Sequence, residues 1–453
     1  MRLIQLSQYK SREIIITISF LLLALSCSYA HAEGQDIWQV RDVTLTNGLR
    51  VLLLEDHRTP TVTLQVWYRV GSRNEHLGMT GISHMLEHMM FRGAKKYGPG
   101  AFSEMVEKNG GNDNAFTTED YTVYFENIAS QKVDILLDLE SDRMADMLLD
   151  PKLFLLEKNV VIEERRLRTE DNPVSDLLEQ VDAAAFKAHP YHSPIIGWMS
   201  DIEQLTRDDV YNYYKTYYAP NNAVLVMVGD FKSEELLTKI ERSFGPIKSN
   251  VSPPKVRSIE PSQRGERRVM LRRTAELPFV AVAYHTPNLT SHDSFALEVL
   301  STILAKGDSS RLYKSLVYDK EIALSIGGDY SRLNIDPNLI YFYAQVLPGR
   351  NPVDVENAIY GEIDRIKREP ISQYELEKAK NQLESSFVFS QDSLFGRGFI
   401  LGQYEILGNW KMVKDYIPGI RAVTAEDVMN VAKKYLTQDN RTLGALIPEK
   451  PQS

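Results

Sequence analysis

The chain has 453 residues, of which 43% are hydrophobic and 25% are charged, as in an ordinary globular protein. This composition excludes a collagen-like, disordered or disulfide-scaffold chain. Because 52 Lys and Arg residues are set against 61 Asp and Glu residues, the formal net charge is −9 and we expect no nucleic-acid partner. The length fits about three domains of 150 residues or two of about 200.

The first 32 residues have the three parts of a secretory signal peptide. A basic start (Arg2, Lys10, Arg12) precedes an apolar run of 12 residues at 14–25, and Ala30-His31-Ala32 is a small-x-small cleavage site. A membrane anchor is the alternative, but the run is short for a hydrocarbon core of about 30 Å. We therefore predict an exported protein, periplasmic or secreted, with no stable membrane span after cleavage of residues 1–32.

Cleavage would remove Cys27, the only cysteine, and would change the formal net charge from −9 to −11. A lipoprotein form stays open, although Ala24-Leu25-Ser26 has no large aliphatic residue where a lipid-attachment site usually has one. Without cysteine, the mature chain has no disulfide and no thiol nucleophile. A bound metal would therefore be held by histidine and carboxylate side chains.

The remaining chain divides into two halves around a proline-rich linker. The linker is expected at 245–265, between an N-terminal domain at 33–244 and a C-terminal domain at 266–453. In the first half, strands are expected at 43–45, 50–54, 61–68, 121–126 and 223–228, and helices at 81–90, 130–147 and 152–168. In the second, strands are expected at 279–284, 339–346 and 441–447, and helices at 293–304, 353–367 and 373–385. Strands mixed with long helices predict the α+β class, and the second half faintly repeats the first.

The strongest chemical signal is the H-x-x-E-H pattern formed by His84, Glu87 and His88. On a helix, these positions share one face, so the two imidazoles can bind one metal ion while Glu87 lies beside them. A surface helix with two incidental histidines is the alternative. The apolar neighbours Met85 and Leu86 argue against it, because they predict a buried helix where unpaired His and Glu would be costly.

A catalytic zinc site needs a third protein ligand, and the helix after Asp150-Pro151 offers four candidates: Glu157, Glu163, Glu164 and Glu170. Glu157 and Glu164 lie about 20° apart on a helical wheel, whereas Glu163 points about 100° away from Glu164. This geometry favours Glu164 as the ligand, with Glu157 as a second carboxylate on the same face. A solvated charged face would also explain any single Glu.

The motif, with Glu164 placed 76 residues after His88, resembles the inverted-motif zinc peptidases, the family of pitrilysin, insulin-degrading enzyme and mitochondrial processing peptidase. The resemblance covers most of the mature chain and is that of a short, two-domain, exported bacterial-type member. It implies one Zn²⁺ per chain held by His84, His88 and Glu164, Glu87 as general base, and Glu157 as an auxiliary acidic residue. It also implies two related domains, each a mostly antiparallel sheet packed with long helices.

Two further groups of residues resemble functional parts of that family. Asn114, Ala115 and Phe116 match the strand that pairs with the backbone of a peptide substrate. Arg311 and Tyr318, seven positions apart, match a pair that binds substrate and stabilises the oxyanion. On an α-helix, that spacing is two turns along one face. The alternative is that Arg311 pairs locally and Tyr318 belongs to the core.

Together these features predict a zinc metalloendopeptidase that hydrolyses peptides or unfolded polypeptide segments through a zinc-activated water. A non-catalytic partner subunit or peptide-binding scaffold is the rival interpretation, and another type of metal hydrolase is a third. Because the chain is one two-domain unit and the family's peptide chamber is formed by two, the resemblance implies a homodimer, with a heterodimer containing a related subunit as the alternative.

Overall fold

A computed structural model of the protein describes residues 38–449. Contacts divide the chain between residues 40 and 41, and every element described below lies in the part that begins at Arg41. The predicted signal peptide at 1–32, which includes Cys27, lies outside the described residues. Among the described helices, none combines the length and the apolar composition that crossing a membrane requires.

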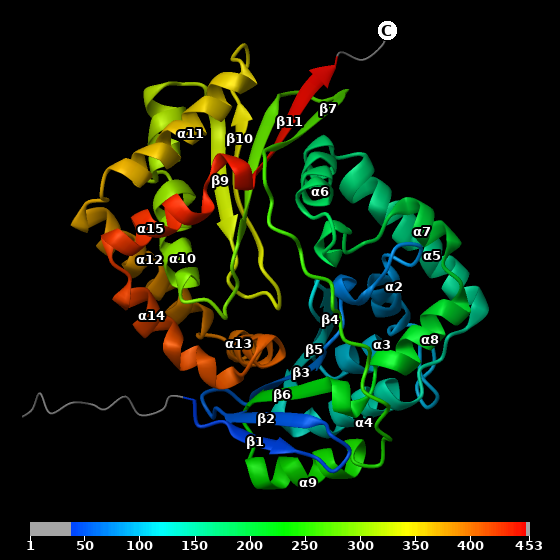
Figure 1. Cartoon of the computed structure of the whole chain (residues 1–453). Coiled ribbons are helices and arrows are strands. Elements are labelled where there is room, and N and C mark those ends of the chain that lie inside the picture. The colour runs from blue at the N-terminus through cyan, green and yellow to red at the C-terminus, as the bar shows by residue number, and fades with distance from the viewer. Residues whose placement is uncertain (1–37, 450–453) are drawn as a thin grey trace, which may run out of the picture. The chain divides into compact units, whose positions relative to one another are not determined.

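The first sheet has six strands in the order β1-β2-β6-β3-β5-β4 (Figure 1). Their bounds are β1 Arg41–Thr44, β2 Arg50–Glu55, β3 Thr61–Tyr68, β4 Asn112–Thr117, β5 Thr122–Ala129 and β6 Ala223–Gly229. Neighbouring strands are antiparallel except β2 and β6, which are parallel. Strand β4 is at the edge of the sheet, so one side of its backbone has no strand partner among the described residues.

The second sheet has five strands in the order β7-β11-β8-β10-β9. Their bounds are β7 Arg267–Thr274, β8 Phe279–Thr286, β9 Ala323–Tyr330, β10 Asn338–Val346 and β11 Arg441–Glu449. Again one pair, β7 and β11, is parallel and the others are antiparallel. This order matches β2-β6-β3-β5-β4 of the first sheet strand for strand. The predicted α+β fold of two related, mostly antiparallel sheets with long helices is therefore confirmed.

Helices cover both sheets. In the first half they are α2 Ile82–Met89, α3 Ala101–Lys108, α4 Val133–Ala145, α5 Pro151–Arg165, α6 Pro173–Ala185, α7 Met199–Gln204, α8 Arg207–Tyr217 and α9 Ser233–Phe244. In the second they are α10 Asp293–Ala305, α11 Pro352–Arg368, α12 Gln373–Ser390, α13 Leu394–Leu407, α14 Tyr416–Ala422 and α15 Ala425–Tyr435. One core lies between the first sheet and helices including α2, α4 and α8, and a second lies between the other sheet and α10, α11, α12 and α15.

Each half also contributes one helix to the sheet of the other half. Helix α6 packs its buried Leu177 and Val181 against the second sheet. Helix α13 packs against the first, where Gln65 Nε2 donates to the Phe395 carbonyl at 3.0 Å and the rings of Trp67 and Phe399 lie 5.3 Å apart. The two halves are therefore interlocked through α6 and α13, an exchange that local sequence patterns do not indicate.

The predicted linker has no helix or strand, since α9 ends at Phe244 and β7 begins at Arg267. The domain boundaries at 33–244 and 266–453 stay a prediction. The sequence patterns did not indicate strands β7 and β9 or helices α3, α6 to α9 and α13 to α15. Strand β7 shows why: in its sequence RRVMLRRT, four arginines hide the alternation that burial reveals.

Candidate metal centre

Helix α2 carries the three residues of the H-x-x-E-H pattern. His84 and Glu87 are buried, each with 9% of its surface exposed, and His88 lies next to them on the same face. The imidazole rings of His84 and His88 are 4.7 Å apart, one helical turn along α2. Met85, Leu86 and Met89 anchor the other side of the helix in the first core, which fixes the direction of the polar face.

The start of α2 is held by a close contact between two glycines. Gly81 and Gly197 both have positive φ, and a Cβ at Gly197 would lie 2.5 Å from the Thr80 carbonyl oxygen. Glu75 accepts hydrogen bonds from the backbone N–H groups of Gly81 and Ser83, which satisfies donors that the first turn of a helix leaves free. These contacts hold α2 in place before any metal binds.

The third carboxylate comes from α5. Glu164 Oε2 lies 3.3 Å from His88 Nε2 and 3.8 Å from His84 Nε2, and the three residues have potential ligand atoms within 4.8 Å of one another. In a tetrahedral site with bonds of about 2.0–2.1 Å, neighbouring ligand atoms are about 3.3 Å apart. Two imidazoles, which bind metal in their neutral form, and one carboxylate at this spacing therefore fit a zinc ion that keeps one coordination position open.

Neighbouring charges orient these groups. Glu157, on the same face of α5, lies 3.3 Å from His88 Nδ1 and is paired with Arg92 at 2.6 Å. Arg168 pairs with Glu164 at 2.7 Å. A carboxylate behind a metal-ligating imidazole fixes the orientation and tautomer of the ring. Glu163 instead points outward, with 62% of its side chain exposed against 16% for Glu164.

The surroundings shift the pKa values of the two histidines and the two glutamates at this site. Burial lowers the pKa of His84 to about 4, and the neighbouring His88 acts in the same direction. Burial favours neutral His88 as well, but hydrogen bonds with Glu164 and Glu157 outweigh it and raise its pKa. The hydrogen bond with His88 lowers the pKa of Glu164. Burial raises the pKa of Glu87, against the opposing effect of a hydrogen bond from Thr117, and a raised pKa suits a group that must accept a proton near neutrality.

The predicted substrate strand lies beside this centre. Asn114, Ala115 and Phe116 are in the edge strand β4, and the last residue of β4, Thr117, donates a hydrogen bond to Glu87 Oε2 at 2.6 Å. The N–H of Ala115 is paired with the Asn114 side chain at 2.8 Å. An unpaired edge can accept an extended peptide as an added strand.

Phe116 is only partly available for substrate. Its ring packs among those of Tyr121, Phe125 and Phe399, with centroids between 5.9 and 6.4 Å away. Because Phe399 belongs to α13, Phe116 also helps to join the two halves. Its predicted role in substrate binding stays a prediction.

Arg311 and Tyr318 do not share an α-helical face. The segment Tyr313–Asp319 is a π-helix, and its wider turns remove the two-turn spacing that the sequence suggested. Arg311 is paired in a bidentate manner with Glu375 of α12, at 2.8 and 3.1 Å, and 12% of its side chain is exposed. Tyr318 is 78% exposed, so it is not a core residue. The local pairing of Arg311 is therefore present, and neither residue bonds to the metal centre within residues 38–449.

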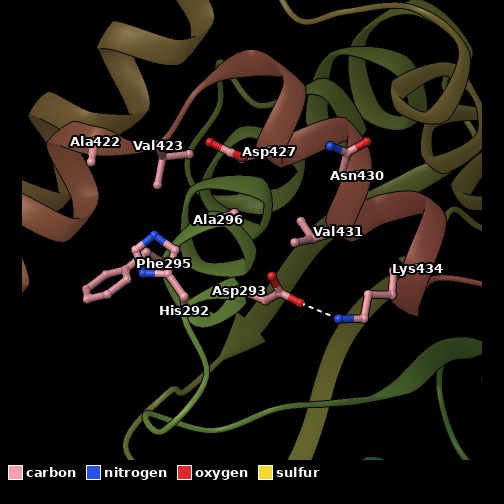
Figure 2. Close-up of a pocket in the computed structure, with 10 residues that line it drawn as sticks. All are labelled: His292, Asp293, Phe295, Ala296, Ala422, Val423, Asp427, Asn430, Val431 and Lys434. Atoms are coloured by element: carbon pink, nitrogen blue, oxygen red, sulfur yellow. Dashed lines mark hydrogen bonds and ion pairs between the residues drawn. The ribbon is translucent and has the colours of Figure 1, made fainter.

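A separate cavity of about 180 Å³ lies between α10 and α15 (Figure 2). Its wall includes His292, Phe295 and an ion pair between Asp293 and Lys434 at 2.7 Å. None of the predicted site residues lines it, so it has no part in the metal centre.

Comparison with known proteins identifies the family. The chain is 31% identical over 434 residues to the zinc protease PqqE of Helicobacter pylori, covering 95% of this chain and 97% of that protein. It belongs to peptidase family M16. The family model described as "Insulinase (Peptidase family M16)" matches residues 50–198, and that described as "Peptidase M16 inactive domain" matches 204–383.

Other relatives and solved structures support the same family. An uncharacterized zinc protease of Bacillus subtilis, YmxG, is 27% identical over 404 residues, covering 88% of this chain and 96% of that one. The crystal structure of a protease from Helicobacter pylori matches with a TM-score of 0.88 and 31% identity, covering 91% of this chain and all of that one. The names of these relatives support metallopeptidase activity and a zinc cofactor.

Around the candidate metal centre lie further residues that the sequence patterns did not select. Arg92 and Arg168 each lie four positions after a predicted ligand, so helical spacing could have indicated them. Thr117 and Glu75 gave no such signal, because their contacts with α2 depend on how β4 and the loop before α2 are placed.

Proposed function

We propose that this M16 protein is an exported zinc metalloendopeptidase that hydrolyses peptides or unfolded polypeptide segments. The observation that carries the proposal is the group of His84, His88 and Glu164, with ligand atoms within 4.8 Å of one another and Glu87 beside them. The zinc protease names of the relatives support the same activity. Export is supported by the sequence of residues 1–32 alone.

In this mechanism, His84, His88 and Glu164 would hold the metal, and Glu157 would keep the His88 ring in its binding orientation. Bound zinc would supply Lewis acidity that polarises the scissile carbonyl and lowers the pKa of water toward about 7. Glu87 accepts the proton of the attacking water and passes it to the leaving amide nitrogen. Its burial keeps bulk water away from the carboxylate during this transfer.

The substrate is expected to lie extended along β4. The open edge of this strand would supply main-chain hydrogen bonds near Asn114 and Ala115. Such pairing does not depend on side-chain identity, which suits an enzyme that acts on peptides or unfolded segments. The end of β4 at Thr117 would then bring the substrate backbone to Glu87.

A homodimer is part of the proposal. Helix α5 and the turn after it expose large apolar side chains beside predicted site residues: Leu155, Leu156, Val160 and Leu167. In the second half, Tyr318 and Tyr374 are exposed as well, and Tyr374 precedes the Glu375 that pairs with Arg311. Exposed apolar clusters often mark interaction surfaces. A twofold pairing that places the first half of one chain against the second half of its partner would bury the apolar side chains of α5 in both chains. It would also bring Arg311 and Tyr318 to the partner's zinc centre, where they would bind substrate and stabilise the oxyanion.

The direct test of the activity compares the wild type with Glu87→Gln. We expect equimolar zinc in both proteins by metal analysis, and peptide hydrolysis only in the wild type, because Glu87 is not a ligand. Zinc without hydrolysis in the wild type would favour a peptide-binding scaffold, and a protein without zinc would contradict the metal site.

The shared-site homodimer has its own test. Glu87→Gln and Arg311→Ala, each nearly inactive alone, are co-expressed with different tags and the mixed dimer is purified. If the sites are shared, the mixed dimer contains one site with both defects and one with neither, so activity returns to about half of that of the wild type. No recovery, a monomeric mass, or a complex with a different subunit would contradict the homodimer.

A further inference from the structure

Thr117 makes the only side-chain hydrogen bond to Glu87 within residues 38–449, at 2.6 Å to Oε2. Glu87 is buried, so a carboxylate oxygen without a partner would be costly at this position. The other oxygen, Oε1, has no hydrogen-bond partner among the described residues. The contact therefore distinguishes the two oxygens of the carboxylate.

The direction of this hydrogen bond follows from the distances around the Thr117 hydroxyl. Thr117 faces Thr122 across the β4–β5 pair, and Thr122 Oγ1 lies 3.0 Å from the Val70 carbonyl and 3.4 Å from Thr117 Oγ1. A hydroxyl has one proton, and the shorter contact is with the carbonyl, so Thr122 donates to Val70. Thr117 Oγ1 lies 2.6 Å from Glu87 Oε2 but 3.4 Å from Thr122 Oγ1, and an ionised carboxylate can only accept, so Thr117 donates its proton to Glu87.

We propose that Thr117 is a positioning residue that orients the general base Glu87 and couples it to the occupancy of the edge strand β4. This inference rests on the proposed function. Thr117 holds Oε2, which leaves Oε1 to accept the proton of the attacking water. Because Thr117 is the last residue of β4, a peptide that pairs along β4 steadies the strand and with it the carboxylate.

The coupling has a kinetic consequence. Strand β4 has six residues, which span about 20 Å at about 3.4 Å per residue. Peptides long enough to pair along this edge should therefore show a higher kcat than short peptides, in addition to a lower KM. Binding energy from remote parts of a substrate is then used to orient the reacting groups.

The test uses zinc-loaded, full-length protein and two peptides that share one cleavage site, one of about four residues and one of about ten. Thr117→Val removes the hydroxyl and keeps the shape of the side chain. We expect kcat on the long peptide to fall about 10- to 100-fold with KM within about 2-fold, because a small misplacement of a catalytic group can cost about 100-fold. Thr117→Ser, which keeps the hydroxyl, should restore kcat to within about 5-fold.

Thr122→Val is the matched control, since it removes a hydroxyl from the residue that faces Thr117. It should leave kcat within about 3-fold while lowering the thermal midpoint, because the Val70 carbonyl loses its donor. In Thr117→Val, zinc content should match that of the wild type, and the thermal midpoint should fall about as much as in Thr122→Val, because Glu87 Oε2 loses its donor. In a Glu87→Gln background, adding Thr117→Val should cause no further loss of the residual rate.

Several outcomes would overturn the inference. They are an unchanged kcat in Thr117→Val, no rescue by Thr117→Ser, loss of zinc from Thr117→Val, or an equal gain in kcat from peptide length in both proteins. These differ from failure of the proposed function, in which the zinc-loaded wild type would hydrolyse neither peptide.

Discussion

Substituting Gly197 by alanine should disturb the metal centre from outside it. Gly197 has a φ of +89°, and an added Cβ would lie 2.5 Å from the Thr80 carbonyl oxygen and 2.6 Å from Gly81 Cα. These are backbone atoms at the start of α2, so no side chain can rotate away to relieve the contact. The loop at 196–198 and the beginning of α2 must therefore separate.

Gly78 provides a matched control. It has a φ of +92°, close to that of Gly197, but no atom lies within 4 Å of its added Cβ. An alanine in this backbone conformation costs about 1–2 kcal/mol at either site. At Gly197, overpacking against the backbone adds about 1–3 kcal/mol. The difference in destabilisation between the two variants therefore measures the effect of the backbone clash at the start of α2.

The assay is the dissociation constant of zinc, measured by competition with a chelator, together with the thermal midpoint of the metal-free protein. If the ligand positions on α2 must be restored when zinc binds, 1–3 kcal/mol weakens zinc about 5- to 150-fold in Gly197→Ala. Gly78→Ala should stay within about 3-fold of the wild type, because its strain is the same with and without zinc. Equal zinc affinity in the two variants would refute the view that the Gly81–Gly197 contact positions α2.

The remaining predictions concern charge and protonation. Glu164→Gln should weaken zinc more than about 100-fold and Glu157→Gln about 10- to 100-fold, whereas the exposed Glu163→Gln should leave its affinity unchanged; an effect of Glu163→Gln in chelator competition would contradict the ligand assignment. Burial raises the pKa of Glu75 to about 8, so its protonated form stabilises the fold at low pH and this contribution is lost as the pH rises from about 4.5 to about 8. Glu75→Gln should therefore reduce the decrease in the thermal midpoint of the metal-free protein over this pH range. An unchanged slope of the midpoint against pH would contradict the raised pKa of Glu75. The net charge of −9 predicts a higher kcat/KM for Lys-rich than for Glu-rich peptides of equal length, with a smaller difference at high salt; equal values at low salt would dismiss the charge effect.

The two parts of the candidate metal centre could each be anticipated, because the information for each part lies within one helix. His84, Glu87 and His88 lie within five residues, so helical periodicity alone places them on one face. The choice of Glu164 over Glu163 followed from the same periodicity on α5, and the exposures of the two side chains agree with it. The family resemblance was needed to connect the two helices, since nothing in either segment specifies the distance between them.

The prediction from α-helical periodicity was wrong for Arg311 and Tyr318, where the helix type changes. Positions 311 and 318 were expected to share an α-helical face, but a π-helix at Tyr313–Asp319 gives them different surroundings. Arg311 turns to Glu375 of α12, 64 positions away in sequence, and Tyr318 remains exposed. An ion pair of this separation depends on how α12 packs, and no local pattern specifies it.

The sequence by itself indicated the α+β class, the shared face of His84, Glu87 and His88, and the shared face of Glu157 and Glu164, because each depends on hydrophobic period or on spacing within one element. Only the tertiary structure decided which residues support the site. The exchange of α6 and α13 between the halves, the glycine contact at the start of α2 and the hydrogen bond from Thr117 to Glu87 all join segments distant in sequence. Such contacts form when packed surfaces meet, so they depend on the whole fold and not on the local preferences of either segment.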